Sequence, residues 1–175
     1  MDYQFFHSMT KEEAKQYLDD FLEFGRNRSF EILAENVHFT VDLDFSLESV
    51  SNIFKSLSGI LKTIPRDPDP GLPEFIRNSE TYKKNLFDFD ERSKPVILAA
   101  AYYLGESFVR SFRQLRWSLG DTKYHQANMP VVTGFISKME LAPVLVAENM
   151  FAAAISGMRD ADSIDEAIET WTSFV

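Results

Sequence analysis

The chain has 175 residues, of which 45% are hydrophobic and 14% aromatic, which fits one globular domain of residues 1–175 and argues against intrinsic disorder. It contains no cysteine, so a disulfide scaffold, a thiolate zinc site and a cysteine nucleophile are excluded. The net charge of −9 disfavours a nucleic-acid-binding protein, which needs a basic surface, and favours a cationic partner.

The N-terminal part predicts a helix, a strand and a second helix. Thr10-Lys11-Glu12-Glu13 has the pattern of a capping box, which begins an amphipathic helix that Gly25 should end. Residues 37–45 then alternate between apolar and polar side chains, which predicts a half-buried strand. Its core-facing side chains should be Val37, Phe39, Val41, Leu43 and Phe45. Ser46 should cap the next helix, whose apolar stripe reaches Leu61.

The middle of the chain predicts a loop, a short helix and a long helix. Residues 65–73 are rich in proline and should form a loop, and residues 75–89 should form a short helix with irregular ends. Residues 93–112 form the longest helical pattern, with apolar residues at steps of three and four. Ser93 should cap this helix, and Pro95 fits its first turn.

After this helix the spacing of the apolar residues changes from every third or fourth position, as in a helix, to every second position, as in a strand. The residues from Leu115 to Leu119 alternate between apolar and polar, and residues 129–136 form a valine-rich segment, so we expect two antiparallel strands. Trp117 should be largely buried on this sheet. The connection, residues 121–128, is longer than a tight hairpin loop, and long loops more often carry function.

The C-terminal part predicts two helices. Pro143 fits the first turn of an apolar helix that ends near Gly157, and Ser163-Ile164-Asp165-Glu166 predicts a capping box at the start of the last helix. The complete pattern is α+β, with about six helices packed around a small antiparallel sheet of about three strands.

The sequence contains no established catalytic, phosphate-binding or dinucleotide-binding motif. The three histidines, His7, His38 and His125, lie far apart in the chain, so we expect no metal site and no cofactor. We see no secretion signal and no apolar run long enough to cross a membrane, so the cytoplasm is the expected location.

The best candidate surface lies on the polar face of the long helix and just after it. It comprises Tyr102, Tyr103, Glu106, Arg110, Arg113, Arg116 and His125. Glu106 and Arg110 have the spacing of an i,i+4 ion pair. Tyrosine and arginine dominate many protein-binding hot spots, although exposed ion pairs are also common as plain structure. As an alternative, Glu106 and His125 would serve a small hydrolase whose arginines bind an anion.

One group of residues carries a resemblance. Tyr102-Tyr103-Leu104-Gly105-Glu106, followed by Trp117 and then Pro130-Val131-Val132, resembles a pattern in small uncharacterised bacterial domains, in which a YLGE helix leads to a Trp-bearing strand and a second strand. The segment from Asp44 to Val50 is similar to the one that often precedes this pattern. Some of these domains are associated with toxin–immunity systems. The resemblance covers about residues 40–155 and implies a cytosolic α+β domain, with no catalytic residues to carry over.

We therefore expect a cytoplasmic domain that binds a protein partner, and neither nucleic acid nor a membrane. The more specific hypothesis is an immunity protein that neutralises a cationic bacterial toxin. The alternatives are a hydrolase-type enzyme and a homo-oligomeric structural protein. A catalytic Glu106 needs a pocket shared with His125, whereas a binding or structural Glu106 should be ionised and paired with Arg110, far from His125.

Overall fold

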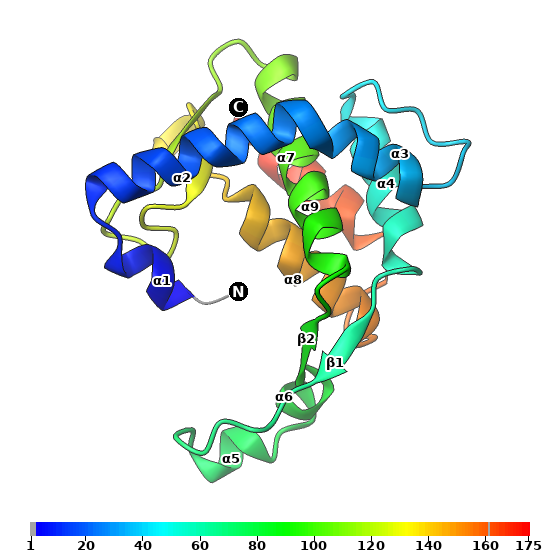
Figure 1. The fold of residues 1–175 in the computed structure, drawn as a ribbon, viewed down its shortest axis with the longest axis vertical. Helices are drawn as coiled ribbons and strands as arrows, with labels where there is room; N and C mark the ends of the chain where they lie inside the picture. The colour runs from blue at the N-terminus through cyan, green and yellow to red at the C-terminus, as the bar shows by residue number, and fades with distance from the viewer. Residues whose placement is uncertain (1–2, 161) are drawn as a thin grey trace.

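The structure is a computed structural model that describes residues 3–160 and 162–175, and most of these residues are helical (Figure 1). The α-helices are α1 (Tyr3–Ser8), α2 (Lys11–Phe24), α3 (Phe30–Asn36), α4 (Leu47–Ser58), α5 (Glu74–Arg77), α6 (Glu80–Lys84), α7 (Ser93–Ser111), α8 (Pro143–Ile155) and α9 (Ser163–Thr172). The strands are β1 (Thr63–Pro65), β2 (Phe87–Phe89), β3 (Arg116–Leu119) and β4 (Pro130–Thr133). A π-helix, η1 (Gly25–Ser29), joins α2 to α3, and a 3-10 helix, η2 (Ile136–Lys138), follows β4.

The predicted α+β class is confirmed, but the expected six helices around a three-stranded sheet are wrong. Helices are more numerous and several are short, and the strands of the described chain form two separate antiparallel pairs, β1 with β2 and β3 with β4. A single bridge between Val132 and Leu141 extends the second pair. Sheets of this size cannot cover a hydrophobic core, so the core lies between helices.

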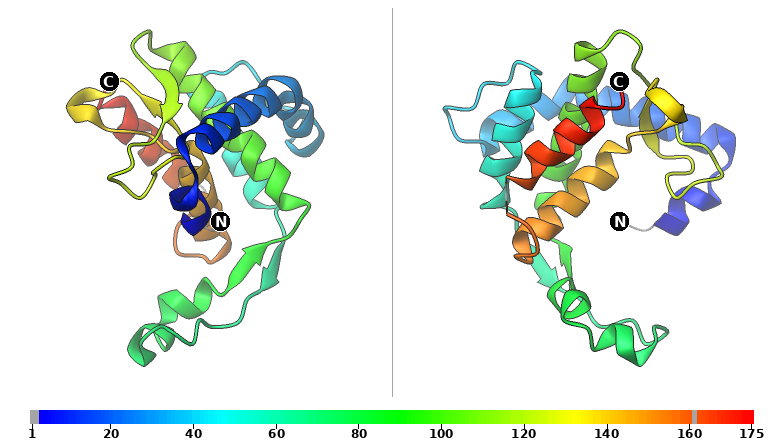
Figure 2. Two further views of the ribbon diagram at one scale, coloured as in Figure 1. Left: turned by 60° about the vertical axis from the view of Figure 1, so that its left-hand side comes forward. Right: turned by 180° about the vertical axis from the view of Figure 1, so that it is seen from behind.

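Helix α7 lies at the centre of the core, as its apolar sequence predicts. Ala99, Ala100, Ala101, Tyr103 and Phe108 are all buried, although they point to different sides of the helix. A helix that is apolar on all sides must be covered on all sides. The covering elements are η1, α3, α4 and α8, which surround α7 in the views of Figures 1 and 2.

The predicted strand pair after α7 is confirmed as β3 and β4, with Arg116 opposite Thr133 in the register. Trp117 is partly buried, and its ring packs on α7 at Gly105. A Cβ atom at Gly105 would lie 2.2 Å from a carbon of that ring, so a residue without a side chain is required there. Gly105 costs about 1 kcal/mol of helix propensity, and packing of Trp117 offsets this cost.

The capping box that begins α2 is confirmed. The Glu13 N–H donates to the Thr10 hydroxyl at 3.2 Å, and the Thr10 N–H donates to the Glu13 carboxylate at 2.8 Å. Helix α2 ends at Phe24 with Gly25 at its C-cap position, as predicted, but Gly25 keeps right-handed helical angles and the chain continues through η1 into α3. Gly25 lies against the ring of Tyr102, where a Cβ atom would approach to 2.0 Å. Close packing against this ring requires a residue without a side chain.

The predicted strand at residues 37–45 is wrong, because the chain forms an irregular loop there. We call residues 37–46 the Phe39 loop. The Val41 N–H donates to the His38 carbonyl at 2.9 Å, which closes a turn with Phe39 at its tip. Phe45 adopts a left-handed φ of 61°, which ends any extended run. Alternation alone does not make a strand, since a strand needs a neighbour with which to pair.

The paired strands β1 and β2 form an arm that projects from the rest of the molecule and carries α5 and α6 at its tip (Figures 1 and 2). The loop predicted for residues 65–73 is confirmed apart from Pro65, which ends β1. The single helix predicted for residues 75–89 is wrong, since this segment contains most of α5, then α6 and β2. The Ser79 hydroxyl accepts from the Tyr82 N–H at 3.2 Å and so begins a new helix after α5.

Two of the predicted helix caps are wrong, although the helices are present. Helix α7 begins at Ser93, whose N–H donates to the Asp90 carboxylate at 2.8 Å, so Asp90 satisfies the free N–H group. Helix α9 begins at Ser163, and the preceding residue, Asp162, makes no capping hydrogen bond. The cap at Ser46 is confirmed, because its hydroxyl accepts from the Ser49 N–H at 3.0 Å.

Lys55 connects α4 to α9 through two ion pairs. Its Nζ lies 2.7 Å from Asp165 Oδ2 and 2.9 Å from Asp162 Oδ1. The hydrogen bond from Lys55 lowers the pKa of Asp165 below its ordinary value of 3.8. A carboxyl with a lowered folded pKa contributes stability that is present above its unfolded pKa and is lost as the pH falls through its folded pKa.

We therefore expect Lys55→Met to lower the melting temperature at about pH 7, and to have less effect as the pH falls below the ordinary Asp165 pKa of 3.8. Thermal unfolding of both proteins, followed by circular dichroism across this pH range, measures the difference. A difference that stays constant down to the most acidic sample would contradict the prediction.

Candidate functional site

The predicted surface on α7 is divided into a buried part and an exposed part. Tyr102 and Tyr103 are buried, so the expectation that both belong to a binding surface is wrong. Tyr102 lies against Gly25, and Tyr103 stacks under Phe45 with ring centroids 4.3 Å apart. Burial raises the pKa of both tyrosine hydroxyls. These tyrosines are therefore part of the packing that holds η1 and the Phe39 loop against α7.

The predicted ion pair between Glu106 and Arg110 is confirmed. Arg110 Nε donates to Glu106 Oε1 at 2.8 Å, and the indole Nε1 of Trp117 donates to Glu106 Oε2 at 3.2 Å. The Arg110 guanidinium also lies 3.8 Å above the ring centre of Phe45, as a cation–π contact. Both carboxylate oxygens are thus bound by fixed donors, so Glu106 connects α7 to β3.

The remaining predicted residues do not converge on Glu106. Arg113, Arg116 and His125 are exposed, and within residues 3–160 and 162–175 their side chains form no hydrogen bond or ion pair. No hydrogen bond in this part of the chain joins Glu106 to His125. The structure therefore provides no support for the hydrolase hypothesis. Among the described residues, no three His, Asp or Glu side chains gather as metal ligands, and no helix is long and apolar enough to cross a membrane.

The Phe39 loop is a surface that sequence reasoning missed. Phe39 is 91% exposed, although alternation placed it in the core. Its ring lies beside that of His38, with centroids 4.4 Å apart. The His38 N–H donates to Ser56 Oγ at 2.8 Å, which fixes the loop to α4, and His38 Nδ1 shares a hydrogen bond with Thr40 Oγ1 at 2.9 Å. The loop therefore presents an aromatic side chain from a fixed turn.

The sequence on either side of the Phe39 loop is acidic, although Arg110 of α7 lies over Phe45 at the end of the loop. No lysine or arginine occurs between Arg28 and Lys55. The same stretch contains five exposed carboxylates, on Glu31, Glu35, Asp42, Asp44 and Glu48. The hydrogen bond from the Ser46 N–H lowers the pKa of Asp44, so this carboxylate stays ionised near neutral pH. The sequence shows that this stretch has carboxylates and no cations. It does not show that Phe39, within the same stretch, is exposed.

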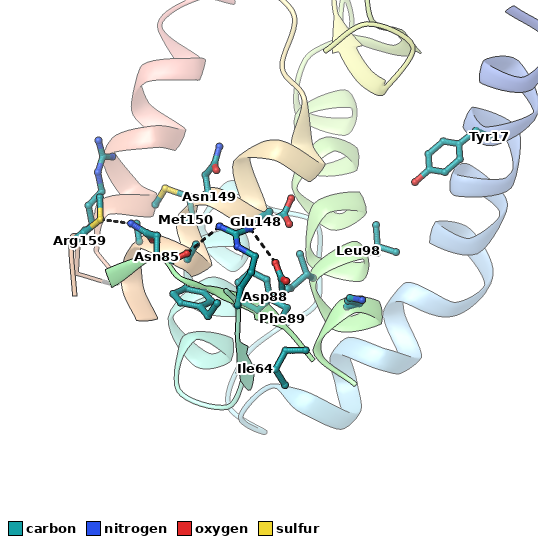
Figure 3. A pocket seen from close by; sticks show the side chains of 17 residues that line it. Tyr17, Ile64, Asn85, Asp88, Phe89, Leu98, Glu148, Asn149, Met150 and Arg159 are labelled. Carbon is teal, nitrogen blue, oxygen red and sulfur yellow. Dashed lines mark hydrogen bonds and ion pairs between the residues drawn. The ribbon is translucent and has the colours of Figure 1, made fainter. Parts of the chain in front are cut away.

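A cavity of about 1060 Å³ lies between the arm and helices α7 and α8 (Figure 3). We call it the arm groove. Its lining includes Ile64, Arg66, Lys94, Leu98, Met150 and Met158. In Figure 3 most of the labelled lining side chains come from the arm, from α7 and from α8, and Tyr17 of α2 lies apart from them. Sequence reasoning missed this groove as well, because its walls come from distant parts of the chain.

Comparison of the chain with protein-family models, with curated proteins and with solved structures found no match. The resemblance of about residues 40–155 to small uncharacterised bacterial domains, some of which are associated with toxin–immunity systems, therefore stays a hypothesis. Function must be argued from the chemistry of the surfaces themselves, which are the acidic Phe39 loop and the arm groove.

Proposed function

We propose that this protein is a protein-binding domain that recognises a cationic partner protein through the Phe39 loop. The observation that carries the proposal is the 91% exposure of Phe39 at the tip of a fixed turn. Burying a phenylalanine side chain contributes about 1.5–3 kcal/mol, so a partner with an apolar pocket gains this energy on contact. An aromatic anchor surrounded by polar groups is the usual arrangement of an interface hot spot.

Charge supports a cationic partner in particular. The sequence from Arg28 to Lys55, which contains the aromatic anchor, carries five exposed carboxylates, of which Glu31 is paired with Arg28, and the whole chain has a net charge of −9. Such a field attracts a basic surface and raises the rate of association. It also repels acidic competitors, which adds specificity.

The internal support of the loop favours tight binding. Phe45, at the end of the loop, donates its N–H to the buried Tyr103 hydroxyl, and His38, near its start, is held by Ser56. Because both ends are fixed before binding, the partner does not have to order the loop. This preorganisation lowers the entropic cost of association.

An immunity protein that neutralises a cationic toxin is the most specific form of this proposal. Its support is the acidic loop together with the resemblance of about residues 40–155 to small uncharacterised bacterial domains, some of which are associated with toxin–immunity systems. If the neighbouring gene encodes a toxin, production of both proteins in one bacterium should permit growth, and Phe39→Ala should abolish this protection. A metabolic operon around the gene would count against the immunity form.

The general proposal is tested by capturing partners on immobilised protein from cells that produce it and measuring the affinity of each candidate. We expect a partner with a basic surface, and Phe39→Ala should weaken its binding by about 30-fold or more, the effect of a hot-spot residue. Raising the salt from about 0.05 M to about 0.5 M should also weaken binding, because exposed charges are screened.

Phe75→Ala provides the matched control. Phe75 is 77% exposed, but it lies at the tip of the arm and away from the Phe39 loop. Its replacement should leave the affinity unchanged. An acidic partner, or equal losses from the two substitutions, would contradict the proposal.

A further inference from the structure

We infer that the arm groove is a binding site for an amphipathic anion, a small ligand with an extended apolar chain and one negatively charged head. The inference is independent of the proposed function, because it rests on another surface. The cavity volume of about 1060 Å³ is at the upper end of the range for small-molecule sites in proteins, so a ligand of this kind fits.

The groove has an apolar part suited to a hydrocarbon chain. Ile64 is 51% exposed and Met158 is 47% exposed, and both line the groove together with the partly buried Leu98 and Met150. Covering these side chains with an apolar ligand removes their surface from water. Methionine side chains adapt their shape to a ligand, so two methionines in one groove suit a flexible chain.

The lining of the groove does not share the strong negative charge of the whole protein. Among its lining residues the cations are Arg66, Lys94 and Arg159 and the anions are Asp88 and Glu148, which gives a net charge of +1. The whole chain has a net charge of −9. Glu91, which pairs with Lys94 from outside the lining, brings the local balance close to zero. An anionic head therefore meets less repulsion in the groove than elsewhere on this acidic protein.

Arg66 and Lys94 are the residues that would bind the anionic head. Arg66 donates to Asp88 at 3.3 Å and to the Asn85 carbonyl at 3.4 Å, which are long contacts that use two of its five N–H groups. Lys94 is paired with Glu91, but both side chains are more than half exposed. Exposed pairs contribute little stability, so both cations can turn toward a carboxylate ligand at small cost.

Dodecanoate and dodecyltrimethylammonium, each below its micelle concentration, provide a direct test by isothermal titration calorimetry. The two probes share the apolar chain and differ in the sign of the head. Non-specific attraction to a chain of net charge −9 favours the cationic probe, so preference for the anion must come from a local site. We expect dodecanoate to bind one site at least about tenfold more tightly than the cation, and to lose about fourfold in affinity for each CH₂ removed.

A charge-matched pair of variants locates the site. The double variant Arg66→Glu, Lys94→Glu should weaken dodecanoate binding by about tenfold or more, because charge-assisted hydrogen bonds are lost. The control, Arg113→Glu with Arg116→Glu, changes the net charge equally at exposed residues outside the groove and should have no effect. If the first variant fails to fold, as judged by circular dichroism, Lys94→Gln alone should still weaken binding measurably.

Three results would overturn the inference: no binding of dodecanoate, equal or tighter binding of the cationic probe, or equal losses from the groove variant and its control. Phe39→Ala should not change dodecanoate affinity. The fate of this inference is therefore separate from that of the partner-binding proposal.

Discussion

Replacing Trp117 with alanine is expected to lower the free energy of unfolding by about 3–5 kcal/mol. The indole ring is stacked on Tyr102 with centroids 6.0 Å apart, meets the edge of Phe21 at 5.6 Å, and fills the space over Gly105. Alanine leaves a cavity between α2 and α7. It also removes the indole N–H that binds Glu106, so one carboxylate oxygen loses its donor.

Denaturant unfolding followed by far-ultraviolet circular dichroism measures this change without depending on the fluorescence of the replaced residue. Trp117→Phe is the informative control, because it keeps an aromatic ring and removes only the indole N–H and part of the volume. Its cost should be clearly smaller than that of alanine. If the alanine variant unfolds with the same denaturant midpoint and slope as the wild type, packing of Trp117 does not contribute to the free energy of unfolding.

Replacing Tyr103 with alanine should have an effect of similar size, about 3–5 kcal/mol, because Tyr103 is among the largest fully buried side chains of the described chain. The substitution removes the ring that stacks under Phe45 and the hydroxyl that accepts from the Phe45 N–H. The hydroxyl also shares a hydrogen bond with Ser49 Oγ at 2.8 Å. Tyr103 therefore connects the Phe39 loop and the start of α4 to α7.

Tyr103→Phe separates packing from hydrogen bonding. The ring remains, but the N–H of Phe45 loses its acceptor, which should cost about 1–3 kcal/mol. Because this bond fixes one end of the Phe39 loop, the same variant should also weaken partner binding. Chemical denaturation gives the first quantity and an affinity measurement gives the second. A Tyr103→Phe variant as stable as the wild type would show that the hydroxyl does not hold the loop.

The parts of the fold that could be predicted from the sequence depend on local patterns. Helix α7 was predicted because its apolar residues keep a helical spacing over about five turns. Strands β3 and β4 were predicted because the apolar residues then alternate with polar ones, and a turn and a valine-rich segment follow. The capping box at Thr10 and the pair of Glu106 with Arg110 were predicted because their partners are three and four residues apart. Such interactions are fixed by helix geometry before any tertiary contact forms.

The incorrect predictions depend on partners that lie far away in the sequence. Gly25 follows α2 at the position expected of a helix stop, but its backbone keeps helical angles and the chain continues into η1 against the ring of Tyr102. The alternation in residues 37–45 favours a strand, but the described chain has no neighbouring strand with which this segment could pair. In both cases tertiary packing overrides a local preference.

The same reason explains the outcome for the candidate sites. Tyr102 and Tyr103 lie on a helix face that looks polar, but η1 and the Phe39 loop cover it. The lining of the arm groove ranges in the sequence from Tyr17 to Arg159, and no local pattern connects residues so far apart. Phe39 is exposed because the chain forms a turn where alternation predicted a strand, and the sequence pattern alone did not indicate this turn. Cavities and exposed anchors are properties of the tertiary structure, and sequence periodicity does not encode them directly.

The π-helix η1 has a consequence for the register of the chain. A π turn holds one residue more than an α turn, and one residue corresponds to about 100° of rotation around a helix. Deleting a single residue from η1 would restore a continuous α-helix from α2 to α3, but everything after the deletion would rotate by that angle. Ser29 and Leu33, which are buried, would leave the core, and the Phe39 loop would be turned with them. The rotation at which α3 enters the Phe39 loop thus depends on one extra residue in η1, about ten positions before Phe39.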